Sequence, residues 1–203
     1  MADANLRFRY DSAANSCSGS APSAEKLLFG QRPRSRLLIL MEQQAKPPSE
    51  SSTRMVRIMM PMDANVAGNV FGGSILRMVD EVASIVAFRH SRNNVVTASL
   101  DRMDFISPVY IGDIIRLIAS INYTHRTSME VGVRVEAENP LTGEVRHTGT
   151  CYLTYVALDK NRKPTTVPTL RPETSEEKRR WAEAEERRRR RLKEIGRLKD
   201  QVE

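Results

Sequence analysis

The sequence contains few of the residues that mark secreted, metal-binding or membrane-spanning proteins. Among 203 residues there are two cysteines and three histidines, and aromatic residues make up 5%. The cysteines, Cys17 and Cys151, form neither a disulfide framework nor a zinc-binding motif, so we expect a reducing compartment, the cytoplasm. The longest early apolar run, at residues 37–40, is too short for a secretory signal or a membrane span. We therefore expect neither secretion nor membrane insertion.

An excess of one charge is also missing from the middle of the chain. The whole sequence has a net charge of +7, from 32 basic and 25 acidic residues, but residues 51–170 hold 13 basic residues against 11 acidic ones. A nearly balanced domain has no broad positive field that would attract a polyanion. The sequence therefore predicts no nucleic-acid partner, although a small basic rim for a nucleotide ligand is compatible with it.

The two ends of the sequence differ from its middle in composition. Residues 1–53 are rich in Ser, Ala and Pro and lack a long periodic segment. They form either a disordered extension or, if translation starts at Met41, a partly mis-annotated one. Residues 173–203 are highly charged and include the unbroken basic run 187–191. We expect a solvated helical tail joined by i,i+4 Glu–Arg pairs, with binding of RNA or an acidic surface as the alternative.

The segment between these ends, residues 54–172, predicts one α+β domain. From Gly72 to about Arg89, apolar side chains occur on every side of a 3.6-residue period, which is typical of a buried helix. Strand-like patterns with turn residues between them cover residues 54–60, 95–107, 113–124, 128–139 and 145–158. We expect a curved antiparallel sheet of about five to six strands wrapped around one long central helix.

One acidic residue within the predicted helix indicates a site. Asp80 lies among apolar residues, where an ionised carboxylate is costly unless it is paired. Gly72 and Gly73, at the start of the helix, leave backbone N–H groups uncovered, and such donors can polarise a carbonyl oxygen. A structural aspartate and a tight glycine turn are the alternatives. Gly72 and Asp80 are separated by roughly 12 Å of helix, so both can act on one substrate only if they come from two subunits of a two-fold dimer.

Four motifs, occurring in order, carry a family resemblance. They are the N-x-x-G-G turn at residues 69–73, M-x-D-E at 78–81, D-F-x-x-P-V-x-x-G-D at 104–113 and R-T-S-M at 126–129. Over about residues 54–172 the sequence resembles the hotdog-fold acyl-CoA thioesterases, specifically the cytosolic acyl-CoA hydrolases shared by bacteria and mammalian brain. The resemblance implies a hotdog fold and hydrolysis of acyl-CoA to CoA and a free fatty acid, without a metal or redox cofactor. It also implies a homodimer, assembled into a hexamer as a trimer of dimers.

The resemblance assigns roles to individual residues. Asp80 matches the family's catalytic carboxylate, which either activates water or attacks the substrate directly. Asn69 matches a second active-site residue that holds water or substrate, and its structural alternative is a turn residue or helix N-cap. Gly72 and Gly73 would supply the oxyanion donors. The residues expected near the substrate, with cross-strand packing or a solvated charge as the alternative, are Thr97, Ser99, Arg126, Thr127, Ser128, Arg89 and Arg92.

Two other functions on the same fold are less well matched. A hotdog dehydratase needs a histidine in the loop before the helix, but here Phe71 occupies the position where some members of the resembled family carry one. A non-catalytic acyl-CoA-binding protein could dispense with the carboxylate, so the presence of Asp80 favours an enzyme. His90, His125 and His147 form no recognisable acid–base or metal set, and we expect them at surface or turn positions.

Overall fold

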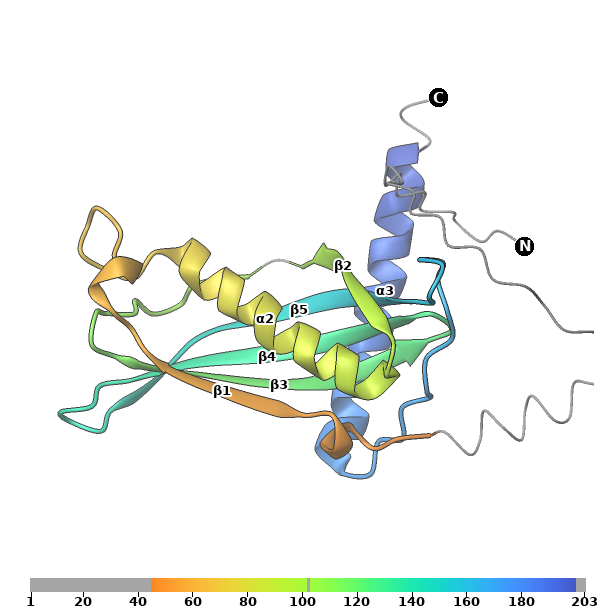
Figure 1. Cartoon of the computed structure of the whole chain (residues 1–203), viewed down its shortest axis with the longest axis horizontal. Coiled ribbons are helices and arrows are strands. Elements are labelled where there is room, and N and C mark those ends of the chain that lie inside the picture. The colour runs from red at the N-terminus through yellow and green to blue at the C-terminus, as the bar shows by residue number, and fades with distance from the viewer. Residues whose placement is uncertain (1–44, 102, 200–203) are drawn as a thin grey trace, which may run out of the picture. The chain divides into compact units, whose positions relative to one another are not determined.

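A long helix lies in the concave face of one curved antiparallel sheet (Figure 1). The computed structural model describes residues 45–101 and 103–199. Its strands are β1 (Thr53–Ile58), β2 (Asn94–Leu100), β3 (Ile114–His125), β4 (Ser128–Glu138) and β5 (Val145–Leu158), in the sheet order β1-β3-β4-β5-β2. The helices are α2 (Gly72–Ser91) and α3 (Ser175–Lys199), with the short 3-10 helices η1 (Pro48–Glu50) and η2 (Pro61–Asp63). The predicted α+β architecture around one central helix is confirmed, with five strands.

The N-terminal extension lies mostly outside the described residues. The disorder expected up to residue 44, the alternative start at Met41 and Cys17 all belong to that part. Residues 45–53 are described, and they are folded. Lys46 forms a parallel bridge with Leu170, and its Nζ donates to the backbone oxygen of His90 at 3.1 Å. The folded part therefore begins before residue 54, the predicted boundary.

Helix α2 buries its apolar residues against the sheet on one side and leaves one flank open. Its buried apolar residues are Ile75, Met78, Val79, Val82, Ala83, Val86 and Ala87. Ile85 and Phe88 remain 37% and 45% exposed. At helical spacing they share a flank with Arg77 and Glu81, which form an exposed ion pair. The expectation of a helix buried on every side is therefore wrong for this flank in the single chain.

The strands follow the predicted pattern, with one boundary displaced. On β4, the alternating apolar residues from Met129 to Ala137 are buried, as the period of two predicts. The hairpin turn after β4 contains Gly143 with a φ of 73°. Strand β2, however, ends at Leu100 instead of residue 107. The following segment still lies beside β5, where the N–H groups of Asp101 and Ile106 donate to the backbone oxygens of Tyr152 and Thr148, both at 2.9 Å, but it is not a regular strand, and its Phe105 ring reaches the start of α2.

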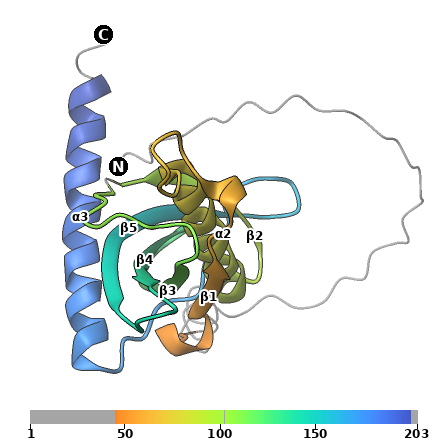
Figure 2. The ribbon, with the colours of Figure 1, turned by 90° about the vertical axis from the view of Figure 1, so that its left-hand side faces the viewer.

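Helix α3 crosses the convex face of the sheet, on the side opposite α2 (Figure 2). The ring of Trp181 lies 5.2 Å from that of Tyr123 on β3, and Ala184 is fully buried. Arg187 Nη2 lies 2.7 Å from Oε1 of Glu130 on β4. One face of α3 is therefore docked on the sheet.

The expectation of a fully solvated C-terminal helix is wrong, although its charge pairs occur as predicted. Arg179 forms ion pairs with Glu176 and Glu183 on the exposed side of α3. The docked side also uses charge, because Arg191 reaches both Glu130 and Asp101. Within residues 45–101 and 103–199, no helix is long and apolar enough to cross a membrane.

Candidate functional site

The start of helix α2 is held by loop contacts and has no side-chain cap. Phe71 is the N-cap residue, with an extended backbone and no capping bond from its side chain. Its N–H donates to the backbone oxygen of Asp63 at 2.7 Å. The carboxylate of Asp63 accepts two contacts from Arg57 Nη2, at 3.1 and 2.9 Å. This chain of contacts fixes the first turn, where the N–H groups of Gly72 and Gly73 have no partner within the helix.

Two phenylalanine rings border the glycine pair. A Cβ atom on Gly73 would lie 2.4 Å from Cε1 of Phe71, and one on Gly72 would lie 3.4 Å from Cζ of Phe105. Both rings are about half exposed. The absent side chain at position 73 therefore allows the Phe71 ring to fold back over the helix start. The backbone donors are flanked by apolar surface, which suits a ligand with a carbonyl group next to a hydrocarbon chain.

Asp80 is a half-buried carboxylate held by two hydroxyl groups. Thr97 Oγ1 donates to Asp80 Oδ1 at 2.8 Å, and the hydroxyl of Tyr155 lies 2.8 Å from the same oxygen. Thr97 on β2 and Tyr155 on β5 are paired in register, so both side chains approach α2 together. Sequence analysis named Thr97 but missed Tyr155, because a contact across 75 residues leaves no local pattern.

The Tyr155 hydroxyl acts only as a hydrogen-bond group at ordinary pH. Burial, and then the neighbouring carboxylate of Asp80, raise its pKa above the usual value of a tyrosine, although the hydrogen bond with Thr97 works in the opposite direction. The phenol therefore keeps its proton near neutral pH and can donate it to Asp80.

Two asparagines close the loop that precedes α2. The N–H of Asn65 donates to the backbone oxygen of Asn69 at 2.7 Å. Asn65 Oδ1 accepts the N–H groups of Ala67 and Asn69, at 2.8 and 3.2 Å. The alternative assignment of Asn69 as helix N-cap is wrong, because Phe71 occupies that position. Both amide side chains belong to one loop directly before the glycine pair, and sequence analysis gave no role to Asn65.

The turn between β3 and β4 lies at the Asp80 end of the site. It contains Arg126, Thr127 and Ser128, and its backbone oxygens at 126 and 127 accept the N–H groups of Val167 and Ala157, at 3.1 and 3.0 Å. The register pairs Met129, directly after the turn, with Tyr155. Thr124 lies opposite Met129, so at about 3.3 Å per residue Arg126, two positions further on, is roughly 7 Å along the strand direction from the pair Thr97 and Tyr155.

Three other residues predicted to contact the substrate either hold structural elements together or lie away from Asp80. Arg89 donates to Thr53 Oγ1 at 2.8 Å and so ties the end of α2 to the start of β1. Arg92 ends α2 with a left-handed backbone, φ 54°. The register of β2 against β5 shifts between Thr97 and Ser99. Ser99 therefore pairs with Thr154, the next pair after the one whose side chains contact Asp80.

The histidines do not join this site, and one of them contradicts its expected location. His90 is fully buried, with Nε2 3.1 Å from the backbone oxygen of Pro168 and Nδ1 3.5 Å from Ser51 Oγ. Burial lowers its pKa. His147 is half-buried on β5, where Nε2 contacts the backbone oxygen of Gly149. Residues 45–101 and 103–199 contain no group of three or more His, Cys, Asp or Glu side chains that could hold a metal ion.

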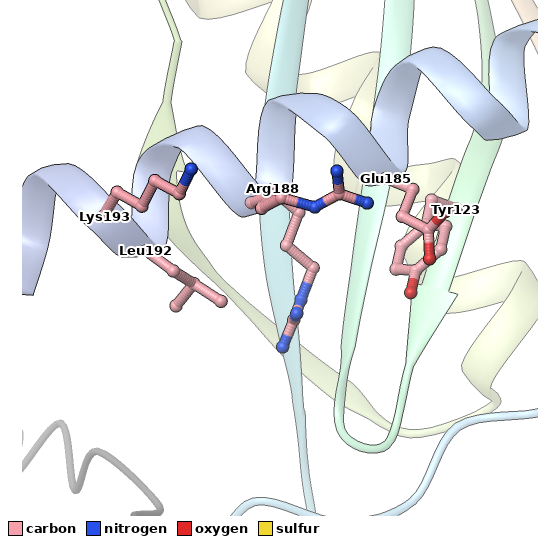
Figure 3. A pocket seen from close by; sticks show the side chains of 6 residues that line it. Tyr123, Glu185, Arg188, Leu192 and Lys193 are labelled. Carbon is pink, nitrogen blue, oxygen red and sulfur yellow. The ribbon is translucent and has the colours of Figure 1, made fainter.

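A shallow groove on the convex side of the sheet is separate from this site. Figure 3 shows Tyr123 and Glu185 at one end of the groove and Leu192 and Lys193 at the other. It lies along α3, whereas Asp80 is on α2 in the concave face. None of the predicted site residues lines it.

Within one chain, the two halves of the predicted site stay apart. Gly72 and Asp80 are eight positions apart on the same continuous helix, which corresponds to roughly 12 Å. The structure thus gathers Asp80 with Thr97 at one place and the glycine pair with the Asn65–Asn69 loop at another.

Comparison with known proteins identifies close relatives. Residues 67–144 match the family model described as Thioesterase superfamily. The chain is 41% identical over 128 residues to YkhA of Bacillus subtilis, an uncharacterized acyl-CoA thioester hydrolase, and this match covers 63% of the chain and 74% of YkhA. Among solved structures, an apo-hexameric acyl-CoA thioesterase is 43% identical with a TM-score of 0.73, covering 75% of this chain and 97% of that one.

A second similar structure carries information on individual positions. It is the acyl-CoA hydrolase of Staphylococcus aureus in complex with butyryl-CoA, CoA and CoA disulfide, 34% identical with a TM-score of 0.70, covering 78% of this chain and 99% of that one. Alanine variants of one aspartate, one asparagine and one threonine of that hydrolase have been characterised. The asparagine precedes the aspartate by 15 positions, and the threonine follows it by 17. Asn65 and Thr97 have these spacings from Asp80, whereas Asn69 precedes it by 11.

Proposed function

Because the chain belongs to the acyl-CoA thioester hydrolases of the thioesterase superfamily, we propose that it cleaves fatty acyl-CoA into CoA and a free fatty acid. The observation that carries the proposal is the carboxylate of Asp80, which Thr97 and Tyr155 orient. It lies on a helix that begins with two glycines and has no side-chain cap for its first N–H groups. A carboxylate and a set of backbone donors are the two parts that thioester hydrolysis requires.

The chemistry divides between these two parts. Asp80 takes a proton from a water molecule, whose oxygen attacks the thioester carbonyl carbon, or it attacks that carbon itself and forms an anhydride that water then opens. In both routes, negative charge builds up on the carbonyl oxygen, and the N–H groups of Gly72 and Gly73 stabilise it. When the tetrahedral intermediate collapses, the C–S bond breaks and the CoA thiolate leaves. In the first route the thiolate takes the proton held by Asp80, and in the second it takes one from solvent before water opens the anhydride.

A two-fold dimer would complete the site. A two-fold axis near Leu76, midway between Gly72 and Asp80, places the glycine pair of one copy beside the carboxylate of the other. One feature of the single chain favours this arrangement. Strand β2 is at the edge of the sheet, where its backbone can pair with a second copy.

Assembly of dimers into a hexamer has its own candidate surface. Met55 packs against the core and Arg57 contacts Met78 on α2, so the alternating residues Val56 and Ile58 face outward from β1. They are 60% and 55% exposed. We assign this edge to contacts between dimers, in line with the hexameric relative.

The nucleotide end of the substrate would bind at the turn between β3 and β4. The phosphates of CoA need cations and backbone donors, and Arg126, Thr127 and Ser128 provide both close to Asp80. Asn65, by its spacing, and Asn69, by the motif, are the amides available to hold water or substrate at the glycine pair. Arg89, in the last turn of α2, is the weaker candidate for the phosphates.

We also propose a cytoplasmic location. Cys151 is a free, buried thiol in the described part of the chain. Such thiols are typical of reducing compartments, which agrees with an enzyme acting on intracellular thioesters.

Release of free CoA thiol from a ladder of acyl-CoAs tests the activity. Wild type should hydrolyse at least one chain length, and Asp80→Asn, which keeps the side-chain volume but removes the base, should lose about 10²–10⁴-fold in kcat. Equal rates in the two proteins would remove Asp80 from the mechanism. The chain-length profile of the wild type also defines the acyl preference.

Complementation between two inactive variants tests the shared site. Gly72→Pro removes one N–H at the first helical position, where proline is compatible with helix geometry, and should cost about 10²–10³-fold in rate. Random co-assembly of Asp80→Asn and Gly72→Pro subunits gives an intact Asp80 opposite an intact Gly72 in about one quarter of the sites. Recovery of about a quarter of wild-type activity supports the dimer. Sites contained within single chains would give no recovery.

A further inference from the structure

Tyr155 carries its hydroxyl into a place where a phenylalanine would serve packing equally well. The residue is 1% exposed and lies on β5, which pairs with β2 on one side and β4 on the other. A buried tyrosine hydroxyl is retained at a cost unless it has a partner. Its partner is Asp80, through Oδ1 at 2.8 Å and through the backbone oxygen at 3.0 Å.

The hydrogen bonds recorded for the Asp80 carboxylate in the described chain all reach one oxygen. Both Thr97 Oγ1 and the Tyr155 hydroxyl approach Oδ1 at 2.8 Å. The phenol has one proton to donate, and the charged oxygen is the stronger acceptor of the two that it contacts. With two donors, Oδ1 has both of its lone pairs engaged, so Oδ2 is the oxygen left for a reacting water or thioester.

We infer that Tyr155 is a positioning residue that fixes the Asp80 carboxylate with Oδ1 toward the sheet and Oδ2 toward the substrate. The inference rests on the proposed thioesterase function and assigns which oxygen acts in it. Without the phenol, Thr97 alone holds Oδ1, and the carboxylate can rotate about its terminal bond. Misplacement of a reacting group by about 1 Å can cost on the order of 10²-fold in rate.

The strand register explains why these two hydroxyls reach the same carboxylate. Thr97 and Tyr155 are opposite each other on β2 and β5, and Tyr155 also pairs with Met129 on β4. The tyrosine therefore lies between two neighbouring strands, and its ring is enclosed. Substrate contact is reserved for Asp80, while Tyr155 acts through it.

Tyr155→Phe tests the inference in the full chain, with Tyr152→Phe as the matched control. Tyr152 lies on the same strand but on the convex face, where its ring packs under the guanidinium of Arg187 at 3.7 Å. We expect Tyr155→Phe to lower kcat by about 10- to 100-fold with KM within about twofold of wild type. Tyr152→Phe should leave both constants unchanged. A kcat for Tyr155→Phe within twofold of the control would overturn the inference.

The same substitution in the Asp80→Asn background separates positioning from a structural effect. If Tyr155 acts through the carboxylate, the double variant should be no slower than Asp80→Asn alone. An equal loss in both backgrounds would mean that Tyr155 only supports the fold, and would refute the inference. Full activity of Asp80→Asn alone would instead refute the proposed mechanism. An inactive Asp80→Asn beside a fully active Tyr155→Phe would refute only the role of Tyr155.

Discussion

Removing the cations that dock helix α3 should release the helix from the sheet. Glu130 has a side chain only 2% exposed, and it is neutralised by Arg187 at 2.7 Å and Arg191 at 3.2 Å. The double substitution Arg187→Ala and Arg191→Ala leaves this carboxylate covered by the helix without either partner. Arg187 also loses its contact with the Tyr152 ring.

The structure sets the size of the effect. Removing one side of a buried ion pair typically costs about 3–5 kcal/mol, and the lost cation–π contact adds about 0.5–2 kcal/mol. The helix can avoid part of this cost by leaving the sheet, which returns Glu130 to water. Undocking is therefore the expected response. If the fold instead keeps the helix in place, a loss of about 3 kcal/mol at an m-value of about 2–3 kcal/mol/M lowers the urea midpoint by roughly 1–1.5 M.

The single tryptophan makes undocking visible. Trp181 is half-buried against Tyr123 on the docked face, so its emission should shift to the red in the double variant at the same protein concentration. Arg189→Ala with Arg190→Ala removes the same charge from the exposed side of the same helix. This variant should leave the emission unchanged and the free energy of unfolding within about 0.5 kcal/mol of wild type. Wild-type emission together with a wild-type midpoint in the Arg187/Arg191 variant would show that these ion pairs do not hold the helix.

Three further outcomes follow from buried groups. Because burial lowers the pKa of His90, the unfolded chain binds a proton below pH 6.5 that the folded chain does not. Urea unfolding should therefore show full stability above pH 6.5 and a loss of up to about 1.4 kcal/mol per pH unit below it, and His90→Gln should not show this loss. Burial raises the pKa of Cys151 to about 11, so in Cys17→Ser protein a thiol reagent at pH 8 should react only after unfolding. Gly73→Ala should destabilise the wild type, where its Cβ meets the Phe71 ring, but stabilise Phe71→Ala by about 0.4–1 kcal/mol.

Much of the fold could be predicted because its signals are local. The alternation in β4 and the glycine turn after it depend on neighbouring residues, and both occur as predicted. The end of β2 was misplaced because residues 101–107 keep a strand-like composition, while Phe105 is drawn to the helix start by a tertiary contact. The composition of residues 101–107 gives no sign of that contact.

The docking of α3 escaped prediction for a different reason. The stripe formed by Trp181, Ala184, Arg187 and Arg191 has helical spacing, but two of its four members are arginines, which are usually solvated. Their partners, Glu130 and Asp101, are about 57 and 90 positions away. A search for tryptophan and alanine on one face of a charged helix would have indicated the contact.

The site divides in the same way between what is local and what is not. Asp80 and the glycine pair could be named from one helix, because an acid among apolar residues and an uncapped start are local anomalies. Tyr155 could not, since its strand pattern is satisfied by any large apolar residue, and Asn65 was passed over for Asn69, which is closer to the glycines in the motif.

The proposed catalytic site and the proposed dimer interface would lie on the same side of the molecule. Helix α2 carries both halves of the site at positions that one chain cannot bring together, and its open flank bears Ile85 and Phe88. The neighbouring strand β2 is an edge that also carries Thr97, one of the two hydroxyls on Asp80. Docking of α3 on the opposite face leaves this side uncovered. A second copy that pairs with β2 would therefore fix the strand that orients the carboxylate, so the interface of the proposed dimer would also form a wall of the site.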